Sequence, residues 1–328
     1  MAAVPVPVPR QRDLLLTLLS LAAAVQLAVA TAPPPRAYPA SPSYRCGWCP
    51  RRSTASLLPP EAGALTGAAC GYGPAAAAEI AAANEGFHIA AVSAGLFRRG
   101  QACGACYQLR CRGHAACGKD GVKVVVVSHV PETATNGTGR GRFLLSEDAF
   151  ATMVHTPRNG GDRLAGPGPA VDVDFRRIPC VYRDRNLSVR VEEASARGRG
   201  HSLALRFLYQ GGQTAIAAVE VAQAVVDGAN DNDDAAPSQT TWRYMTRSEG
   251  SPAVWRTSRA PPGPLRLRVV VAAGSGGKWL RSDGAVLPAD WVPGAVYDTG
   301  LRVADVAAST CGGASCDSDD EDGDEELR

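Results

Sequence analysis

The sequence predicts an all-β protein of two domains, a disulfide-bonded first domain and a cysteine-free β-sandwich, on three observations. The chain has 328 residues, which fits about two domains of ~100–200 residues each. Eight of the ten cysteines lie at or before Cys180, and none lies between positions 181 and 310. The cysteine-free region holds short alternating segments separated by glycine and proline turns, a pattern typical of a β-sandwich.

The N-terminal region predicts secretion. Two arginines precede an apolar run at 14–30 that ends in Ala-Val-Ala, so residues 1–30 are expected to be a removed signal peptide. The run has 17 residues and could marginally span a bilayer, but its small-residue end and the prolines after it favour cleavage. No later segment is long and apolar enough to span, so the mature chain is expected to be extracellular, with no membrane partner.

The first domain is expected over 66–183, after a proline- and serine-rich segment, 31–65, that should be mostly irregular. Three strands are predicted, at 103–111, 121–127 and 170–178. The second is a continuous apolar run, consistent with a strand buried on both faces, and the third alternates between apolar and charged residues. One clear short helix is predicted near 147–155.

The second domain is expected over 187–306. Glycine and proline turns separate its predicted strands. These seven strands are 187–193, 202–210, 214–223, 242–245, 264–272, 278–282 and 300–306.

The cysteines and sequons fit a secreted chain. An oxidising compartment favours disulfides among Cys46, Cys49, Cys70, Cys103, Cys106, Cys111, Cys117, Cys180, Cys311 and Cys316. Cys46 with Cys49 and Cys103 with Cys106 also have the spacing of zinc or redox sites, so those interpretations stay open at this point. Two sequons, at Asn136 and Asn186, are open to glycosylation.

The charge distribution is uneven. The formal net charge of +2 gives no indication of nucleic-acid binding. Two runs are strongly acidic, 227–234 and 317–326. Without them, the rest of the chain is distinctly basic. Runs of like charge are mostly solvated, so residues 307–328 are expected to form an acidic disordered tail.

Several motifs in order resemble the plant expansin superfamily. They are "ACGYG" (69–73), "CGACYQLRC" (103–111), "RRIPC" (176–180) and "FLYQGGQTAIAAVEVAQ" (207–223). The motifs "CGWC" near the N-terminus, "APPGPL" (260–265) and "GAVYDTG" (294–300) narrow the resemblance to the expansin-like A subgroup. The resemblance covers roughly residues 46–306.

The resemblance implies a fold and a disulfide pattern. It implies a six-stranded double-psi β-barrel, related to one class of endoglucanases, followed by an immunoglobulin-like β-sandwich that binds polysaccharide. The pairs it implies are Cys70 with Cys103, Cys106 with Cys180 and Cys111 with Cys117, which leaves Cys46 with Cys49 and Cys311 with Cys316.

The sequence argues against catalysis in the barrel. Hydrolysis of a glycosidic bond usually needs two carboxyl groups, one as acid and one to activate water. Aligned with the motifs that expansins share with these endoglucanases, Leu144 stands where one aspartate is expected and His129 where the second is expected. Glu147 and Asp148 are better explained as first-turn residues of a helix capped by Ser146. No catalytic residue, metal site or cofactor is therefore expected.

The aromatic residues of the second domain are the candidate binding residues. Trp242 and Tyr244 are two apart on a predicted strand and share a face. Trp255 corresponds to the later tryptophan of a family motif and is expected to be exposed. Trp291 is expected in the core, and both interpretations stay open for Trp279. Hydrogen bonds to sugar hydroxyls or contacts with acidic pectin are open to Arg247, Arg256 and Lys278, although a solvated surface charge is the simpler interpretation of each.

Taken together, the sequence predicts a secreted plant cell-wall protein that binds wall polysaccharide, such as cellulose, xylan or another matrix glycan, as a monomer and without hydrolysis. Loosening of non-covalent contacts between polysaccharides is an activity that the resemblance implies. A structural or regulatory wall protein without loosening activity is the first alternative, and a glycoside hydrolase is the second.

Overall fold

The computed structural model describes residues 50–58, 69–84, 86–113, 115–130, 142–154, 170–197, 202–212, 215–224, 240–249, 251–273 and 276–303. Several expectations lie outside these residues and stay predictions: the signal peptide, the irregular character of the segment before position 50, the sequon at Asn136, the acidic tail, and the pairs Cys46–Cys49 and Cys311–Cys316. None of the helices in the described ranges is both long and apolar enough to cross a membrane.

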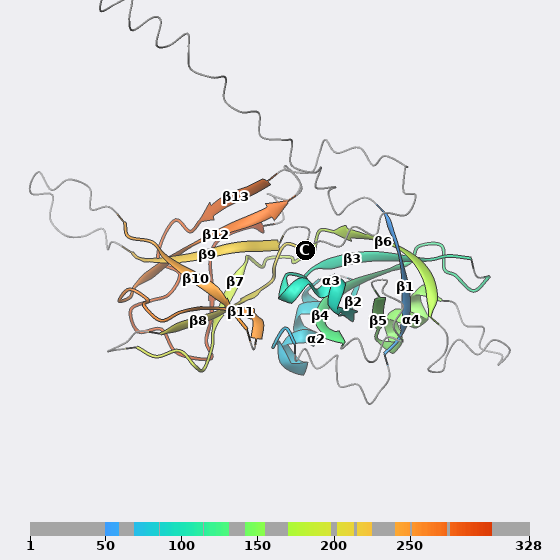
Figure 1. Ribbon diagram of the computed structural model, residues 1–328, viewed down its shortest axis with the longest axis horizontal. Helices are drawn as coiled ribbons and strands as arrows, with labels where there is room; N and C mark the ends of the chain where they lie inside the picture. Colours follow the sequence, from blue (N-terminus) through green and yellow to red (C-terminus); the bar gives the residue numbers. More distant parts are fainter. Residues whose placement is uncertain are drawn as a thin grey trace, which may run out of the picture. The chain divides into compact units, whose positions relative to one another are not determined.

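The first part of the chain is a closed six-stranded barrel with the strand order β1-β5-β2-β4-β3-β6 (Figure 1). Strands β2 and β4 are parallel, as are β1 and β5, and the other pairs are antiparallel. The strands are β1 (Arg51–Leu57), β2 (Phe87–Ser93), β3 (Cys106–Cys111), β4 (Val122–Val130), β5 (Arg142–Leu145) and β6 (Val171–Ile178).

The barrel begins earlier than the sequence suggests. The expectation of irregular structure up to position 65 is wrong over β1, which pairs with β5 on one side and β6 on the other and so closes the barrel. The inward positions of β1 are the small residues Ser53 and Ala55, which carry little hydrophobic signal. The strand is therefore held mainly by backbone pairing on both edges.

The barrel core follows the predicted patterns. Val124 to Val127 in β4 are all buried, which confirms a strand covered on both faces, and β6 shows the predicted alternation in its first half. Tyr107, Phe143 and Phe175 meet edge to face, with ring centroids 5.1–6.0 Å apart. This is the favoured geometry for aromatic pairs, and it fills the barrel with three large side chains.

Helices α4 (Glu147–Met153) and α2 (Gly73–Ala83) pack against the barrel strands. Helix α4 confirms the predicted helix, and the Ser146 hydroxyl accepts a hydrogen bond from the Ala149 N–H at 3.3 Å. Helix α2 was not predicted, because its alanine-rich sequence shows no contrast between an apolar and a polar face. Alanine nevertheless has the highest helix propensity, and a proline lies in the first turn of α2, where it is tolerated. A short turn of helix, α3 (Ala94–Phe97), leads into the 3₁₀ segment η3 (Arg98–Gly100).

Three disulfides fasten the first domain, and they are the three that the resemblance implies. They join Cys70 to Cys103, Cys106 to Cys180 and Cys111 to Cys117. Cys103 and Cys106 therefore belong to different disulfides, which rules out the zinc and redox interpretations of that pair.

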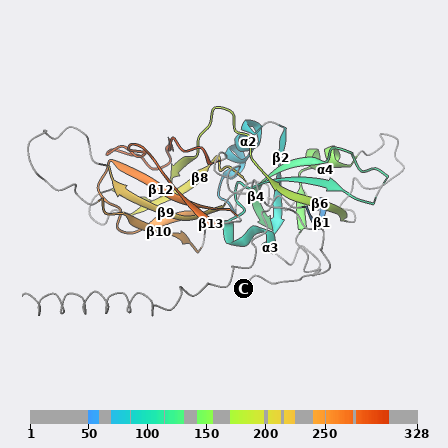
Figure 2. The ribbon, with the colours of Figure 1, turned by 90° about the horizontal axis from the view of Figure 1, so that it is seen from above.

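The second part is a β-sandwich made from one folded sheet of eight strands, in the order β13-β12-β9-β10-β11-β8-β7-β14. Residues 243–245 of β10 pair with β9, whereas residues 246–248 pair with β11, so β10 belongs to both layers. The strands are β7 (Ser188–Val191), β8 (Leu203–Leu208), β9 (Ala215–Gln223), β10 (Arg243–Ser248), β11 (Ser251–Thr257), β12 (Leu265–Ala273), β13 (Gly276–Arg281) and β14 (Val296–Asp298). In two perpendicular views β12, β9 and β10 lie next to one another (Figure 1 and Figure 2).

The predicted fold class, an all-β protein with a six-stranded barrel followed by a sandwich, is confirmed. Six of the seven predicted sandwich strands are present, but the prediction of a strand at 300–306 is wrong for the described residues 300–303. Strand β14 ends just before them. Strand β11 was not predicted, because it contains Pro252 and follows a glycine, residues that usually mark a turn.

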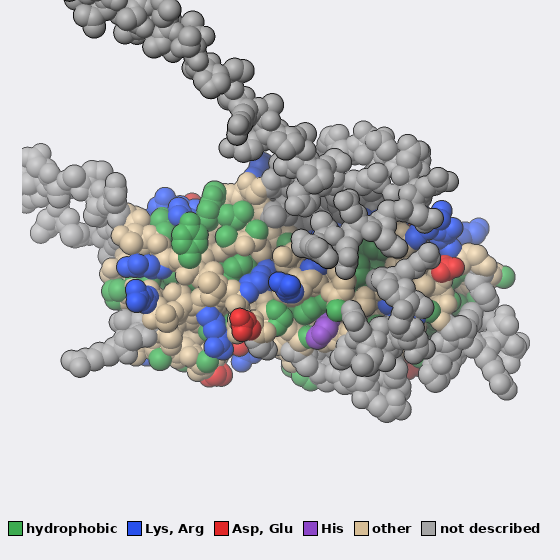
Figure 3. Space-filling view, in the orientation of Figure 1, with side chains coloured by type: hydrophobic (Ala, Val, Ile, Leu, Met, Phe, Trp, Pro, Cys, Tyr) green, Lys and Arg blue, Asp and Glu red, His purple; other side chains and the backbone are tan. Residues whose placement is uncertain are grey.

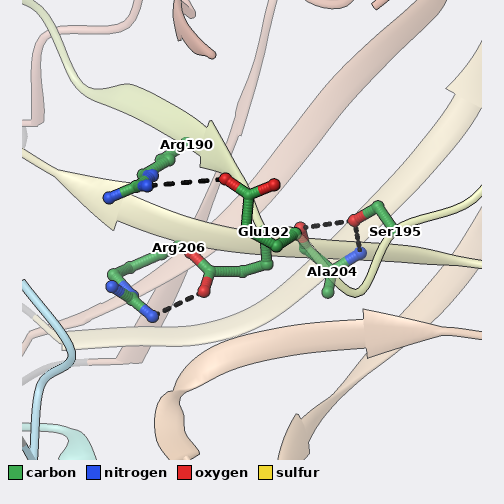
Figure 4. Close-up of polar contacts among 6 residues, drawn as sticks. Arg190, Glu192, Ser195, Ala204 and Arg206 are labelled. Carbon is green, nitrogen blue, oxygen red and sulfur yellow. Dashed lines mark hydrogen bonds and ion pairs between the residues drawn. The ribbon is translucent and has the colours of Figure 1, made fainter. Parts of the chain in front are cut away.

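A buried ion pair lies between the β7–β8 connection and β8. Arg206 in β8 donates a hydrogen bond of 2.6 Å to Glu192 (Figure 4). Burial lowers the Arg206 pKa, and the charge of Glu192 opposes that shift. The Arg206 guanidinium lies against Gly71 of the "ACGYG" motif, where a Cβ would stand 2.5 Å from the Arg206 Nη2 atom. Gly71 also has a φ of +66°, a conformation that favours glycine, and this explains one residue of the motif.

Candidate functional site

The layer β13-β12-β9-β10 has one face in the core and one face outward. In β12, Leu265, Leu267 and Val269 are fully buried, and Arg266 and Arg268 alternate with them. Because successive side chains of a strand point to opposite faces, the two arginines lie on the outward face. We call this surface the outer face, and it is formed by residues of β9, β10, β12 and β13 together with Trp242.

A row of four directly paired residues crosses the outer face. Tyr244 in β10 is opposite Glu220 in β9, Glu220 is opposite Arg268 in β12, and Arg268 is opposite Arg281 in β13. The Arg268 Nε atom donates a hydrogen bond to Glu220, whose side chain is 1% exposed. Burial of the carboxylate is compensated by this charged partner. The pair also fixes the position of the Arg268 guanidinium on the sheet.

Two tryptophan rings flank that guanidinium. The Arg268 Cζ atom lies 4.3 Å from the ring centroid of Trp242 and 4.6 Å from that of Trp279. Arg281 and Arg266 also face the Trp242 ring, at 5.7 and 6.0 Å. A guanidinium within about 6 Å of an aromatic ring is attracted by the ring quadrupole. The rings and the arginines therefore hold one another in place.

Exposed aromatic rings and basic side chains share this surface. Tyr244 is 69% exposed and Trp279 is 51% exposed, whereas Trp242 is half-buried. Arg281 is exposed, and an Arg266 N–H donates to the Thr240 hydroxyl at 2.9 Å. In the space-filling view, hydrophobic side chains lie beside basic ones over this part of the sandwich (Figure 3).

The structure brings together two of the three predicted binding residues. Trp242 and Tyr244 both lie at the outer face. The expectation that Trp255 is exposed is wrong, because its ring is 5% exposed and belongs to the sandwich core. Trp291 is in the core, as predicted. Trp279 joins the site because β13 pairs with β12, and this pairing could not be read from the sequence.

Arg247 covers Trp255 and is not available as a ligand-binding residue. Its Cζ atom lies 4.4 Å from the centroid of the Trp255 ring, and its N–H groups donate to the Pro252 and Ile216 carbonyls at 2.8 and 2.7 Å. Burial lowers the Arg247 pKa to about 10. The side chain thus has a structural role beneath the surface, contrary to one interpretation of the sequence.

Leu144 in β5 and His129 in β4 are the residues that the resemblance aligns with the two expected aspartates. Leu144 is 4% exposed and forms a small apolar cluster with Ala91 and Val130. The His129 ring stacks on Phe97, with centroids 4.7 Å apart and planes 19° apart. The buried His129 Nδ1 atom makes no hydrogen bond within the described part of the chain. Leu144 is therefore committed to packing, and the partly buried His129 ring packs on Phe97.

The nearby carboxylates belong to helix α4. Glu147 and Asp148 are exposed in its first turn, directly after the Ser146 cap. Their predicted place in the first turn is confirmed, and a negative charge there complements the helix dipole. The described residues contain no group of three or more histidine, cysteine, aspartate or glutamate side chains that could hold a metal ion.

Comparisons with known proteins agree with this architecture. The family model for the expansin C-terminal domain matches residues 188–288. Expansin-like A4 of Oryza sativa subsp. japonica is 55% identical over 297 residues, which cover 87% of this chain and 89% of the relative. The chain belongs to the expansin-like A family. Expansin-like A2 of Arabidopsis thaliana is 37% identical over 272 residues, covering 83% of this expansin-like A chain and 91% of that relative.

Two bacterial structures resemble this expansin-like A chain at low identity. The apo expansin of Clavibacter michiganensis is 20% identical, covers 77% of this chain and 98% of its own length, and gives a TM-score of 0.48. A mutant of that expansin in complex with cellohexaose is 22% identical, covers 78% of this chain and 97% of its own length, and gives a TM-score of 0.46.

The outer face of this expansin-like A chain offers two kinds of interaction. The exposed rings of Tyr244 and Trp279 provide flat apolar surface, and Arg281 provides charged donors beside them. Exposed hydrophobic patches rimmed by polar residues commonly mark interaction sites. The positions of the two expected aspartates in the barrel, by contrast, hold a packed leucine and a stacked imidazole.

Proposed function

We propose that this protein is a secreted plant cell-wall protein that binds wall polysaccharide through the outer face and does not hydrolyse it. The observation that carries the proposal is the exposure of Tyr244 and Trp279 on one face of a rigid sheet. Large aromatic rings are usually buried, so two exposed rings on one face indicate a ligand with flat apolar surfaces. The ring faces of polysaccharides have this character, and membership of the expansin-like A family agrees with such a ligand.

The absence of hydrolysis is the second part of the proposal. It is supported by Leu144 and His129, which stand where the resemblance places the two aspartates. An isobutyl group can neither donate a proton nor activate water, and a mechanism of the usual kind needs two suitably spaced carboxyls.

A binding assay tests the first part. We expect Tyr244→Ala combined with Trp279→Ala to raise the apparent Kd for insoluble cellulose or xylan about tenfold, which corresponds to ~1.4 kcal/mol. The matched control is Val296→Ala, which removes another exposed apolar side chain, 52% exposed, on β14 of the other layer. Unchanged retention of the double variant, or an equal loss in the control, would overturn the assignment of the site.

A mechanical assay tests what binding does. We propose that the bound protein loosens non-covalent contacts between polysaccharides, which predicts creep of isolated walls under constant load after addition of the purified chain. Binding without creep would instead indicate a structural or regulatory wall protein. Release of reducing sugar from soluble glucans would contradict the non-hydrolytic part of the proposal.

A further inference from the structure

The arginines of the outer face indicate that its ligand is negatively charged. The three outward arginines Arg266, Arg268 and Arg281 surround Trp242. The buried Glu220 carboxylate neutralises Arg268 only. The described part of the outer face therefore carries more positive than negative charge, and Arg281 presents its charge to solvent. A neutral glycan could accept hydrogen bonds from these groups but would gain no attraction between opposite charges.

Trp242 orients these cations more than it offers free surface. Guanidinium groups occupy positions over the Trp242 ring, the nearest at 4.3 Å, and the ring itself is half-buried. Trp242 is therefore better suited to holding arginines in place than to stacking on a sugar. Arginine in a fixed orientation can bind a carboxylate through two parallel N–H groups. The stacking surface is left to Tyr244 and Trp279, beside the cations.

We infer that the outer face recognises polysaccharide that carries carboxylates, that is, uronate-containing chains, in preference to neutral chains. This inference rests on the proposed binding function and specifies the ligand of the same site. Tyr244 and Trp279 contact sugar rings, and Arg281 with Arg266 meets the carboxylates. Tyr244 and Arg281 lie in one row across four neighbouring strands, so they are about 14 Å apart at the backbone. That span accommodates several sugar units, so stacking and charge recognition act on one chain.

The test uses two ligands that share a sugar backbone and differ in charge through methyl esterification of their carboxylates. The full chain is titrated with polygalacturonate and with fully methyl-esterified polygalacturonate, which has the same backbone without carboxylates, at low and high salt. We expect tighter binding to the charged polymer and a loss of that preference as salt increases, since exposed charges are screened. Equal affinity for the two polymers would overturn the inference.

Single substitutions identify which arginine recognises the carboxylates. We expect Arg281→Gln to reduce the preference for the charged polymer about tenfold, or ~1.4 kcal/mol, and Arg281→Glu to abolish it. The matched control is Arg256→Gln, which removes an exposed arginine from β11 in the other layer. If Arg256→Gln reduces the preference as much as Arg281→Gln does, the preference reflects the charge of the whole body and the inference fails.

Tyr244→Ala separates this inference from the proposed function. If it weakens binding to both polymers while Arg281→Gln changes neither, the outer face binds polysaccharide but does not select charge. If Tyr244→Ala weakens binding to neither polymer, the proposed function itself is wrong. The proposed function and the inference are both supported if Tyr244→Ala weakens binding to the two polymers and Arg281→Gln weakens binding to the charged polymer alone.

Discussion

Arg206 donates a hydrogen bond of 2.6 Å to Glu192, and the two side chains are 9% and 19% exposed (Figure 4). We expect Glu192→Gln to lower the free energy of unfolding by about 3 kcal/mol, because it leaves the buried Arg206 charge without an ionic partner. Denaturant unfolding followed by intrinsic fluorescence measures the change. Glu193→Gln is the control, since the contact of Glu193 with Arg190 spans 3.8 Å and Glu193 is 74% exposed. An exposed pair of this kind contributes about 0–1 kcal/mol, so similar losses in both variants would contradict the interpretation.

Trp255 provides the second prediction. Its ring lies in the sandwich core and is covered by Arg247, so Trp255→Ala should destabilise the protein by about 3–5 kcal/mol. A fall in polysaccharide binding by this variant should therefore accompany a fall in thermal stability. At a temperature where the variant is still folded, its binding should equal that of the unsubstituted chain. Weaker binding by the fully folded variant would restore Trp255 to the site.

The third prediction concerns alkaline pH. Burial raises the pKa of Tyr72 to about 12, whereas an exposed tyrosine titrates near 10. The folded state holds the proton more tightly, so this contribution is intact below pH 10 and is lost as the pH rises through 12. Two pKa units correspond to about 2.7 kcal/mol at most. The stability of Tyr72→Phe should therefore fall less than that of the unsubstituted chain between pH 10 and 12. Identical profiles, each normalised to its value at pH 8, would refute this.

Leu144 provides the fourth prediction. Leu144→Asp places a carboxyl in an apolar cluster with Ala91 and Val130, where ionisation is costly. We expect a lower melting temperature and no release of reducing sugar, because His129 cannot replace the second carboxyl. Leu144→Asn is the control, because it introduces a polar side chain without a charge. At neutral pH it should lower the stability less than Leu144→Asp does. Measurable hydrolysis by the aspartate variant would show that one substitution suffices for catalysis.

The fifth prediction concerns the acidic run between β9 and β10. Asp227, Asp231, Asp233 and Asp234 belong to the connection that returns to the outer face at Thr240, where Arg266 donates a hydrogen bond. Replacing the four with asparagine should strengthen binding to polygalacturonate at low salt, because fewer carboxylates compete with the ligand or repel it. The same change at Asp319, Asp320, Asp322 and Asp324, in the second acidic run of the sequence, is the charge-matched control. An equal effect of both would indicate net charge alone.

Much of the fold could be predicted from the sequence where the pattern of apolar residues was clear. The valine run of β4 and the alternation of β6 gave correct strands, because burial on two faces and on one face leave different patterns. Helix α2 and strand β1 could not be predicted in this way. Alanine and serine are small, so neither segment shows which side faces the core, and β1 is defined by partners distant in the sequence.

The candidate site could be predicted only in part. The spacing of Trp242 and Tyr244 predicted one strand with both side chains on one face. Both do lie at the outer face, although β10 begins at Arg243 and Trp242 lies just before it. Trp255 was misjudged because its expected exposure came from its place in a family motif. In the structure three consecutive residues of β11, from Ala253 to Trp255, are buried, so Trp255 belongs to the core. The contacts of Arg268 with Trp242 and Trp279 depend on the register of β12 against β13 and β9, which is set by long-range pairing.

The divided pairing of β10 has a mechanical consequence. Tyr244 lies where β10 is bonded to β9, and the next residues of the strand are bonded to β11. A tensile load on a polymer held at Tyr244 would pass along β10 into hydrogen-bond ladders on two sides. Three residues beyond Tyr244, Arg247 ties the strand to the Pro252 and Ile216 carbonyls. A load along β10 would therefore be shared between two strands, one in each layer, whereas a load on an edge strand reaches a single neighbour, so the proposed binding face is joined to both layers of the sandwich.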